Sequence, residues 1–149
     1  MALDIGSKRI GVAMSDELLL TAQGRETIRH TTTQRDIDEI SRLVKEEGVI
    51  EVILGLPLNM NGTQSANSKE VLEFAEALGG SISIPVKTWD ERLTTVGAEK
   101  ALLEANMSRL KRKRLNDMVA AQLILQGYLD SRGKNNNSAP RKTNDVGEV

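Results

Sequence analysis

MALDIGSKRIGVAMSD, residues 1–16, is the stretch from which the fold of this chain can be worked out. A short apolar run ends at Asp4, residues 6–9 favour a turn, and residues 10–14 run back as a second β-branched strand. This pattern predicts a β-hairpin with a carboxylate at its lip. Because Asp is disfavoured in sheets and its charge is costly to desolvate, Asp4 should have a partner. That partner is either a metal ion or, alternatively, the backbone of the Gly6 turn.

Composition limits the classes of protein and of site. With 149 residues, of which 39% are hydrophobic and 28% charged, the chain fits one ordinary water-soluble domain. We expect neither a membrane span nor a signal peptide. The chain has no cysteine and one histidine, His30, so a thiolate or multi-histidine zinc site cannot be built and any metal would be held by oxygen. The net charge of -1 argues against bulk electrostatic coating of nucleic acid.

The spacing of apolar residues after the hairpin predicts the remaining elements. Thr33 and Asp36 suggest a capping-box-like helix start, and Gly48 a helix end. Strands are expected at 24–29, 49–56 and 82–89, and helices at 33–47, 66–78, 96–105 and from 116 to about 129. With right-handed crossovers, this order predicts an α/β, RNase H-like fold: a five-stranded mixed sheet, three antiparallel strands then two parallel, flanked by helices. We expect one domain over residues 1–132 and a disordered tail over 133–149.

The loop GLPLNMNGTQS, residues 55–65, follows the most apolar predicted strand. Ligands of open α/β sheets collect outside the carboxyl ends of the strands, which makes the polar side chains of this loop candidates for nucleic-acid contacts. The simpler alternative is a plain connecting loop. The candidates are Asn59, Asn61 and Thr63.

Acidic residues occur at two further positions. Asp90 and Glu91 end the last predicted strand, and the adjacent Arg92 either faces a phosphate or pairs with one of these acids at the surface. Asp117 should lie in the first turn of a core helix, where a capping or helix-dipole role is the alternative to a functional one.

The predicted topology brings these acids together with Asp4. Carboxylates gathered without basic partners repel one another, and such a cluster persists most readily around divalent cations. Mg²⁺ or Mn²⁺ suits an oxygen-only ligand set, and two ions about 3.5–4 Å apart would promote phosphodiester hydrolysis. The candidate metal ligands are Asp4, Asp90, Glu91 and Asp117.

A basic run precedes the last helix, and it is either a solvated face or a grip for a nucleic-acid strand or duplex. Phosphate contacts of this kind predict salt-sensitive, structure-selective binding, and the near absence of aromatic residues argues against extensive base stacking. The run consists of Arg109, Lys111, Arg112, Lys113 and Arg114.

Four segments, in this order and spacing, resemble the YqgF/RuvX family, described as Holliday junction resolvases and as nucleases of pre-ribosomal RNA. They are LDIGSKRIGVAMSD (3–16), GLPLNMNGTQS (55–65), DERLTT (90–95) and NDMVAAQLILQGYLD (116–130). The resemblance implies a bacterial-type cytoplasmic nuclease that matures the 5′ end of 16S ribosomal RNA. It places the catalytic acids on Asp4, Glu91 and Asp117, with Asp90 as a fourth candidate ligand.

Chemistry and resemblance together suggest a role for each residue. Asp4 would bridge two ions, and Glu91 and Asp117 would each ligate one. The basic side chains of the hairpin turn and of the DER motif would hold phosphates; these are Lys8, Arg9 and Arg92. Structured RNA or branched DNA is the expected partner, ribosomal precursor particles are a further candidate, and the chain is expected to be a monomer or a weak homodimer.

Two departures from the family pattern accompany the resemblance. Family members usually have a few more residues before the LDIG strand, so the start of this chain is expected to be truncated or misassigned. Related folds often carry their second acid on the strand that corresponds to 49–56, where this chain has only Glu51.

Three other functions are weighed. Cleavage of four-way DNA junctions needs a two-fold dimer, and a non-catalytic module that binds ribosomal RNA needs no metal. An ATP-dependent kinase or chaperone-like protein is a third possibility, since phosphate-binding hairpins of the actin-like class also have a DxG turn, but those folds require two such domains and this chain is long enough for one.

Overall fold

A single mixed sheet of five strands forms the centre of the molecule. The computed structural model describes residues 1–93 and 109–138. The strand order is β3-β2-β1-β4-β5, as the sequence predicts for an RNase H-like sheet. The strands are β1 (Ala2–Ile5), β2 (Arg9–Ser15), β3 (Ala22–Arg29), β4 (Val52–Leu56) and β5 (Val86–Asp90).

The pairing of the strands follows the predicted pattern. The first three are antiparallel, and Asp4 of β1 lies opposite Gly11 of β2. Strand β4 runs parallel to β1, and β5 runs parallel to β4. The carboxyl ends of β1, β4 and β5 therefore meet at one edge of the sheet, where ligands of such sheets collect.

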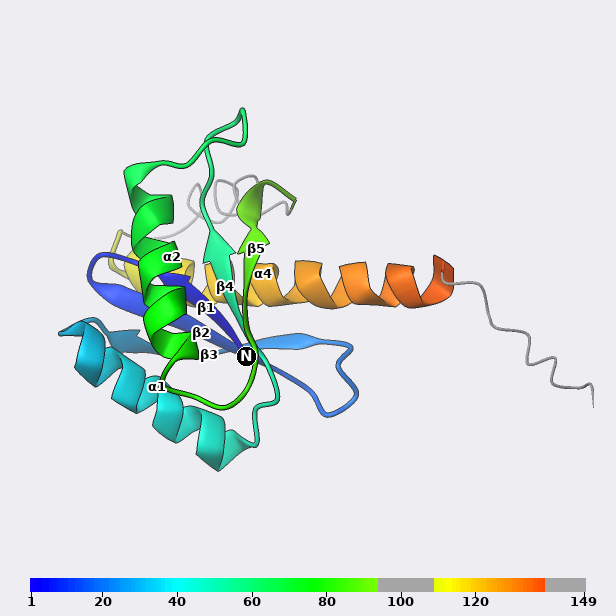
Figure 1. Cartoon of the computed structure of the whole chain (residues 1–149), viewed down its shortest axis with the longest axis horizontal. Helices are drawn as coiled ribbons and strands as arrows, with labels where there is room; N and C mark the ends of the chain where they lie inside the picture. Colours follow the sequence, from blue (N-terminus) through cyan, green and yellow to red (C-terminus); the bar gives the residue numbers. More distant parts are fainter. Residues whose placement is uncertain (94–108, 139–149) are drawn as a thin grey trace, which may run out of the picture.

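Helices cover both faces of the sheet (Figure 1). Side chains alternate between the faces of a strand, so Leu3 packs in the core under α1 and α2 whereas Ala2 packs under α4. The helices are α1 (Thr33–Glu47), α2 (Ala66–Gly79) and α4 (Arg109–Ser138), and the short 3-10 helix η1 (Glu91–Leu93) follows β5. Within residues 1–93 and 109–138, none of the helices has the length and hydropathy to traverse a lipid bilayer.

Helix α1 has the predicted bounds, but its N-cap lies one residue before Thr33, the predicted cap. Its N-cap is Thr32, whose hydroxyl accepts a hydrogen bond from the Arg35 backbone, so Thr33 does not cap it. Asp36 is 1% exposed and binds the His30 ring and the Thr31 backbone N–H (3.2 Å). The expected capping-box partner is therefore used instead to hold the end of β3 against the helix.

Strands β4 and β5 begin later than predicted. Gly48 ends α1 with a left-handed φ of 64°, and Ile50 is 65% exposed before the strand starts at Val52. Segment 82–85 likewise leads into β5 without belonging to it. Apolar composition alone did not separate these connections from the strands.

Helix α4 is longer than expected at both ends. Its backbone is already helical at Arg109, so the predicted start at Asn116 and Asp117 is wrong, and Asp117 does not lie in a first turn. Lys, Arg and Leu are good helix formers, and no Gly or Pro separates the basic run from the apolar segment. The helix continues to Ser138, and residues 139–149, like the helix expected at 96–105, lie outside the described residues.

Candidate functional site at the carboxyl edge of the sheet

A cavity of about 350 Å³ opens where β1 and β4 end. Two of the predicted acids, Asp4 and Glu91, line it together. Its other lining residues come from the β1–β2 turn, the end of β4 and the first turns of α2; they are Ile5, Gly6, Ser7, Gly55, Pro57, Asn67, Glu70 and Val71.

The sheet register explains why Asp4 and Glu91 meet. Ala2 and Leu3 pair with Ile53 and Leu54, so the next residues along these parallel strands are Asp4 and Gly55. A Cβ atom on Gly55 would lie 2.6 Å from Glu91 Oε1 and 2.4 Å from the Ile124 Cδ1 atom of α4. Glycine at this position therefore lets the Glu91 carboxylate lie over β4, beside the strand that carries Asp4.

Asp117 is placed only by its backbone. It lies in α4 directly before Met118, whose side chain packs over Gly24 of β3. Within the part of the chain that the structure describes, no group of three His, Cys, Asp or Glu side chains is arranged to hold a metal ion. Asp4 and Glu91 thus place two carboxylates at one cavity, and Asp117, the third predicted acid, belongs to α4, which covers the sheet face of Ala2.

Helix α4 is fixed to the sheet by polar as well as apolar contacts. Gln126 Oε1 accepts a hydrogen bond from the Ala22 backbone N–H (2.9 Å), and Gln122 Nε2 donates to the Ala22 carbonyl oxygen (3.2 Å). These two glutamines satisfy backbone groups of the edge strand β3. They set the position of the helix that carries Asp117.

Asp90 has a different environment from its neighbour Glu91. Its carboxylate accepts hydrogen bonds from Arg92 Nε (3.0 Å) and Nη2 (2.7 Å) and from the Arg92 backbone N–H (2.9 Å). The Arg92 side-chain hydrogen bonds hold the pKa of Asp90 below its usual value. The surface ion pair, which was the simpler alternative for this motif, is thus present for Asp90.

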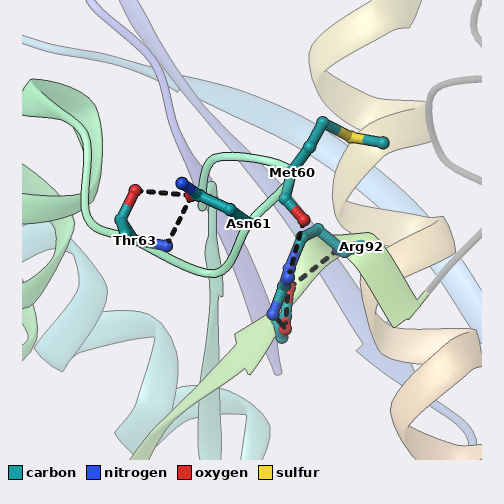
Figure 2. Close-up of polar contacts among 5 residues, drawn as sticks. Met60, Asn61, Thr63 and Arg92 are labelled. Atoms are coloured by element: carbon teal, nitrogen blue, oxygen red, sulfur yellow. Dashed lines mark hydrogen bonds and ion pairs between the residues drawn. The ribbon is translucent and has the colours of Figure 1, made fainter.

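The loop between β4 and α2 is folded on itself and attached to η1. Asn61 Oδ1 accepts hydrogen bonds from the Thr63 hydroxyl (2.6 Å) and backbone N–H (3.1 Å), and Asn59 Nδ2 donates to Thr63 Oγ1 (3.0 Å). Arg92 Nη1 donates to the Met60 carbonyl oxygen (3.2 Å), which joins the loop to the end of β5 (Figure 2). The polar side chains predicted as nucleic-acid contacts therefore also hold the loop in shape.

The predicted basic contacts lie in two places. Lys8 is exposed in the β1–β2 turn, directly after the cavity residue Ser7, and Arg9 is half-buried at the start of β2. The backbone of the basic run 109–114 forms the start of α4, and the structure does not describe the side chains of this run.

Two cavity residues were missed by the sequence reasoning. Glu70 and Asn67 of α2 line the same cavity as Asp4 and Glu91, and both are exposed. Their signal in the sequence was weak, because polar residues in the first turns of a helix are common. They become candidates for the site only because α2 lies beside the ends of β1 and β4.

Glu51 lies away from this site. Its carboxylate accepts a hydrogen bond from Tyr128 and pairs with Lys87 Nζ (3.0 Å), next to the start of β4. The cavity that contains Asp4 lies at the other end of that strand. Glu51 therefore does not occupy the position of the second acid that related folds carry on this strand.

Comparison with solved structures shows the same fold. A structure of T. thermophilus RuvC in complex with Holliday junction substrate matches with a TM-score of 0.55, over 89% of this chain and 93% of that chain. A second Thermus thermophilus RuvC structure matches with a TM-score of 0.52, over 89% of this chain and 94% of that chain. Both are 13% identical to this chain, so the likeness concerns the fold alone.

Comparison with curated proteins gives much higher identity. A protein of Clostridium novyi is 52% identical over 131 residues, which cover 88% of this chain and 97% of that protein. A protein of Desulforamulus reducens is 50% identical over 134 residues, which cover 90% of this chain and 98% of that protein. Both carry the name "Putative pre-16S rRNA nuclease". The family model described as "RuvX: Holliday junction resolvase" matches residues 1–131, and with these relatives it shows that the chain belongs to the RuvX family.

Proposed function

We propose that this chain is a metal-dependent nuclease that hydrolyses phosphodiester bonds in structured RNA, at the 5′ end of pre-16S ribosomal RNA. The observation that carries the proposal is the placement of Asp4 and Glu91 in one cavity at the carboxyl edge of the sheet. Two carboxylates from adjoining parts of the sheet suit a hard cation and a phosphate substrate. Ribosome assembly would place such an enzyme in the cytoplasm.

The donor set fits Mg²⁺ or Mn²⁺, because it consists of carboxylate oxygens and the chain has no cysteine. Asp4, Glu91 and Asp117 would hold the ions. When bound, the ions would supply a water nucleophile of lowered pKa and stabilise the leaving oxygen. Asp90 is a weaker candidate ligand, since Arg92 occupies its carboxylate.

The chain's own residues would position the substrate. Lys8 and Arg9, beside the cavity, would attract the phosphates that flank the scissile bond, and the basic start of α4 would bind a strand further away. Arg92 would serve this role only in part, because its guanidinium already binds Asp90. These contacts carry no sequence information, so the substrate would be chosen by shape.

RNA is the preferred substrate because the relatives at about half identity carry the pre-16S rRNA nuclease name. The second candidate is a four-way DNA junction, which the description of the family model favours. Junction cleavage would require a two-fold dimer with two active sites.

Cleavage of two end-labelled substrates distinguishes these functions. A pre-16S ribosomal RNA fragment and a four-way DNA junction are incubated with the full chain and Mg²⁺ or Mn²⁺. We expect cutting of the RNA alone. Paired symmetric nicks in the junction would support the resolvase, and binding of RNA without cutting would support a non-catalytic module.

The variant Asp4→Asn tests the catalytic assignment. We expect cleavage to slow on the order of a thousandfold. The bound ions would stabilise the transition state by several kcal/mol, and each loss of about 1.4 kcal/mol lowers the rate about tenfold. RNA binding should remain. The control is Asp38→Asn, which removes an exposed carboxylate on α1, on the other sheet face, and should cleave like the wild type. Equal rates for Asp4→Asn and the wild type would contradict the assignment.

A further inference from the structure

Met60 is the most exposed large apolar side chain among residues 1–93 and 118–133. It is 93% exposed, at the tip of the loop that follows β4. Its chain neighbours Asn59 and Asn61 are polar and exposed, so Met60 is a single apolar side chain within the tip of this loop. Flat protein interfaces need many more apolar contacts than one side chain provides.

The loop holds Met60 in a defined place. Its two ends pair through an isolated β-bridge between Leu58 and Gln64, and the Asn59 N–H donates to the Thr63 carbonyl oxygen (3.0 Å). Gly62 takes a left-handed φ of 84°, which most other residues would adopt only with strain.

Arg92 links this loop to the cavity. It donates to the Met60 carbonyl oxygen while it pairs with Asp90, and it directly follows Glu91 in the chain. The guanidinium lies against Gly62 of the same loop, because a Cβ atom on Gly62 would be 3.4 Å from Arg92 Nη1, an ordinary van der Waals distance. The residue that binds the Met60 backbone therefore directly follows Glu91, so the position of the loop tip is tied to the position of Glu91.

Each aromatic ring of the chain already packs against other side chains. The sequence has one Phe, one Trp and one Tyr. Phe74 is 6% exposed in the core, and the rings of Trp89 and Tyr128 contact each other edge to face on the α4 side of the sheet. Methionine has a flexible, polarisable side chain that makes favourable contacts with aromatic rings, so it is the side chain suited to contact a base.

We propose that Met60 is a wedge that contacts an unstacked base beside the scissile phosphate, and that Arg92 is a positioning residue that fixes the wedge relative to Glu91. This inference rests on the proposed nuclease function. Apolar side chains, methionine included, are known to insert between base steps and to open them, for an unstacking cost that added contacts repay. A wedge would select distorted or branched structure without reading sequence.

Base unstacking can be measured separately from cleavage. A set of pre-16S ribosomal RNA fragments, each with one 2-aminopurine near the 5′ junction of the mature sequence, is bound to the full chain in the Asp4→Asn background. We expect a fluorescence rise at one position, its loss in Met60→Ala, and its retention in Met60→Leu. Because Met60 is exposed, Met60→Ala should leave the thermal midpoint unchanged.

Cleavage by otherwise wild-type enzyme gives the second readout. Met60→Ala should slow single-turnover cleavage about tenfold, and Arg92→Gln should slow it and spread the cut over neighbouring positions. Equal fluorescence rises in wild type and Met60→Ala would overturn the wedge, whether or not the RNA is cut. A rise that depends on Met60 in a protein that cuts no RNA would keep the wedge and reject the nuclease function.

Discussion

At the scale of single residues, the adjacent carboxylates Asp90 and Glu91 have different surroundings. Asp90 is the last residue of β5 and is held by Arg92, whereas Glu91 lies over Gly55 and lines the cavity with Asp4. Two adjacent acids at the end of a strand point in different directions, so Asp90 forms an ion pair whereas Glu91 is a candidate ligand.

The pKa of Asp90 gives a test of this separation. Hydrogen bonds from Arg92 lower it below the ordinary value of 3.8, so Arg92→Gln should raise it back toward that value. Since the folded-state pKa is depressed, the pair contributes stability above the unfolded-state pKa, and this contribution is lost as pH falls through the folded-state value. Between pH 6 and 8 this contribution to stability should stay constant.

Carboxyl-carbon NMR across pH 2–7 measures this titration. Arg42→Gln is the matched control, because Arg42 pairs with Glu39 and Glu46 on α1 and should leave the titration of Asp90 unaltered. An Asp90 titration that is the same in Arg92→Gln and the wild type would show that the ion pair does not set the pKa.

At the scale of elements, the close contact between β4 and α4 decides where Glu91 lies. Gly55 of β4 is buried, and it leaves room for both the Ile124 side chain and the Glu91 carboxylate. The same helix crosses β3 at Gly24, where Met118 occupies the space of a Cβ atom. Two glycines on one sheet face thus let α4 pack closely above the acids.

Gly55→Ala should therefore disturb both stability and activity. The added methyl group would meet Ile124 at 2.4 Å and Glu91 at 2.6 Å, and overpacking of this kind destabilises by about 1–3 kcal/mol. We expect a lower free energy of unfolding in urea and a larger loss of cleavage than the fraction unfolded explains.

Gly133→Ala is the control for this substitution. Gly133 lies in α4 with no atom within 4 Å of its added Cβ, so alanine there should be neutral or stabilise by up to about 1 kcal/mol. Equal stability and activity of Gly55→Ala and the wild type would mean that α4 moves away easily and that Glu91 does not depend on Gly55.

At the scale of the whole molecule, the two faces of the sheet carry different kinds of residues. The face under α1 and α2 holds the larger apolar core, and the α4 face carries Asp4 with Ala2, beside Glu91. The basic run belongs to the start of α4. A strand bound along that helix would therefore meet the side of the sheet that carries the acids.

Salt dependence of RNA binding tests this arrangement. The double variant Arg112→Gln/Lys113→Gln should bind RNA more weakly, and the slope of log K against log salt should become shallower by about 1.4 for single strands or about 1.8 for a duplex. The control is Arg42→Gln/Lys45→Gln on α1, which changes net charge equally on the other sheet face. Equal slopes for all three proteins would contradict a role for the basic run.

Local chemistry of the sequence was sufficient for the elements that the structure describes and for their order. Alternating and helical periods, the turn residues and the right-handed crossover rule led to the five-stranded mixed sheet, with Asp4 in its central strand. The errors lay at boundaries, at the N-cap of α1, at both ends of α4 and at the starts of β3, β4 and β5, because composition changes little across these ends.

Only the tertiary structure decided how the acids are used. Asp90 and Glu91 are equivalent in a sequence, and the packing of Arg92 against Asp90 and of Gly55 beneath Glu91 distinguishes them. Asn67 and Glu70 likewise reach the cavity only because α2 lies beside the ends of β1 and β4, and Met60 is placed by the hydrogen bond from Arg92 to its carbonyl oxygen. Periodicity is a local property of the chain, whereas a cavity depends on contacts between residues distant in sequence, and those contacts form only when the sheet and helices pack together.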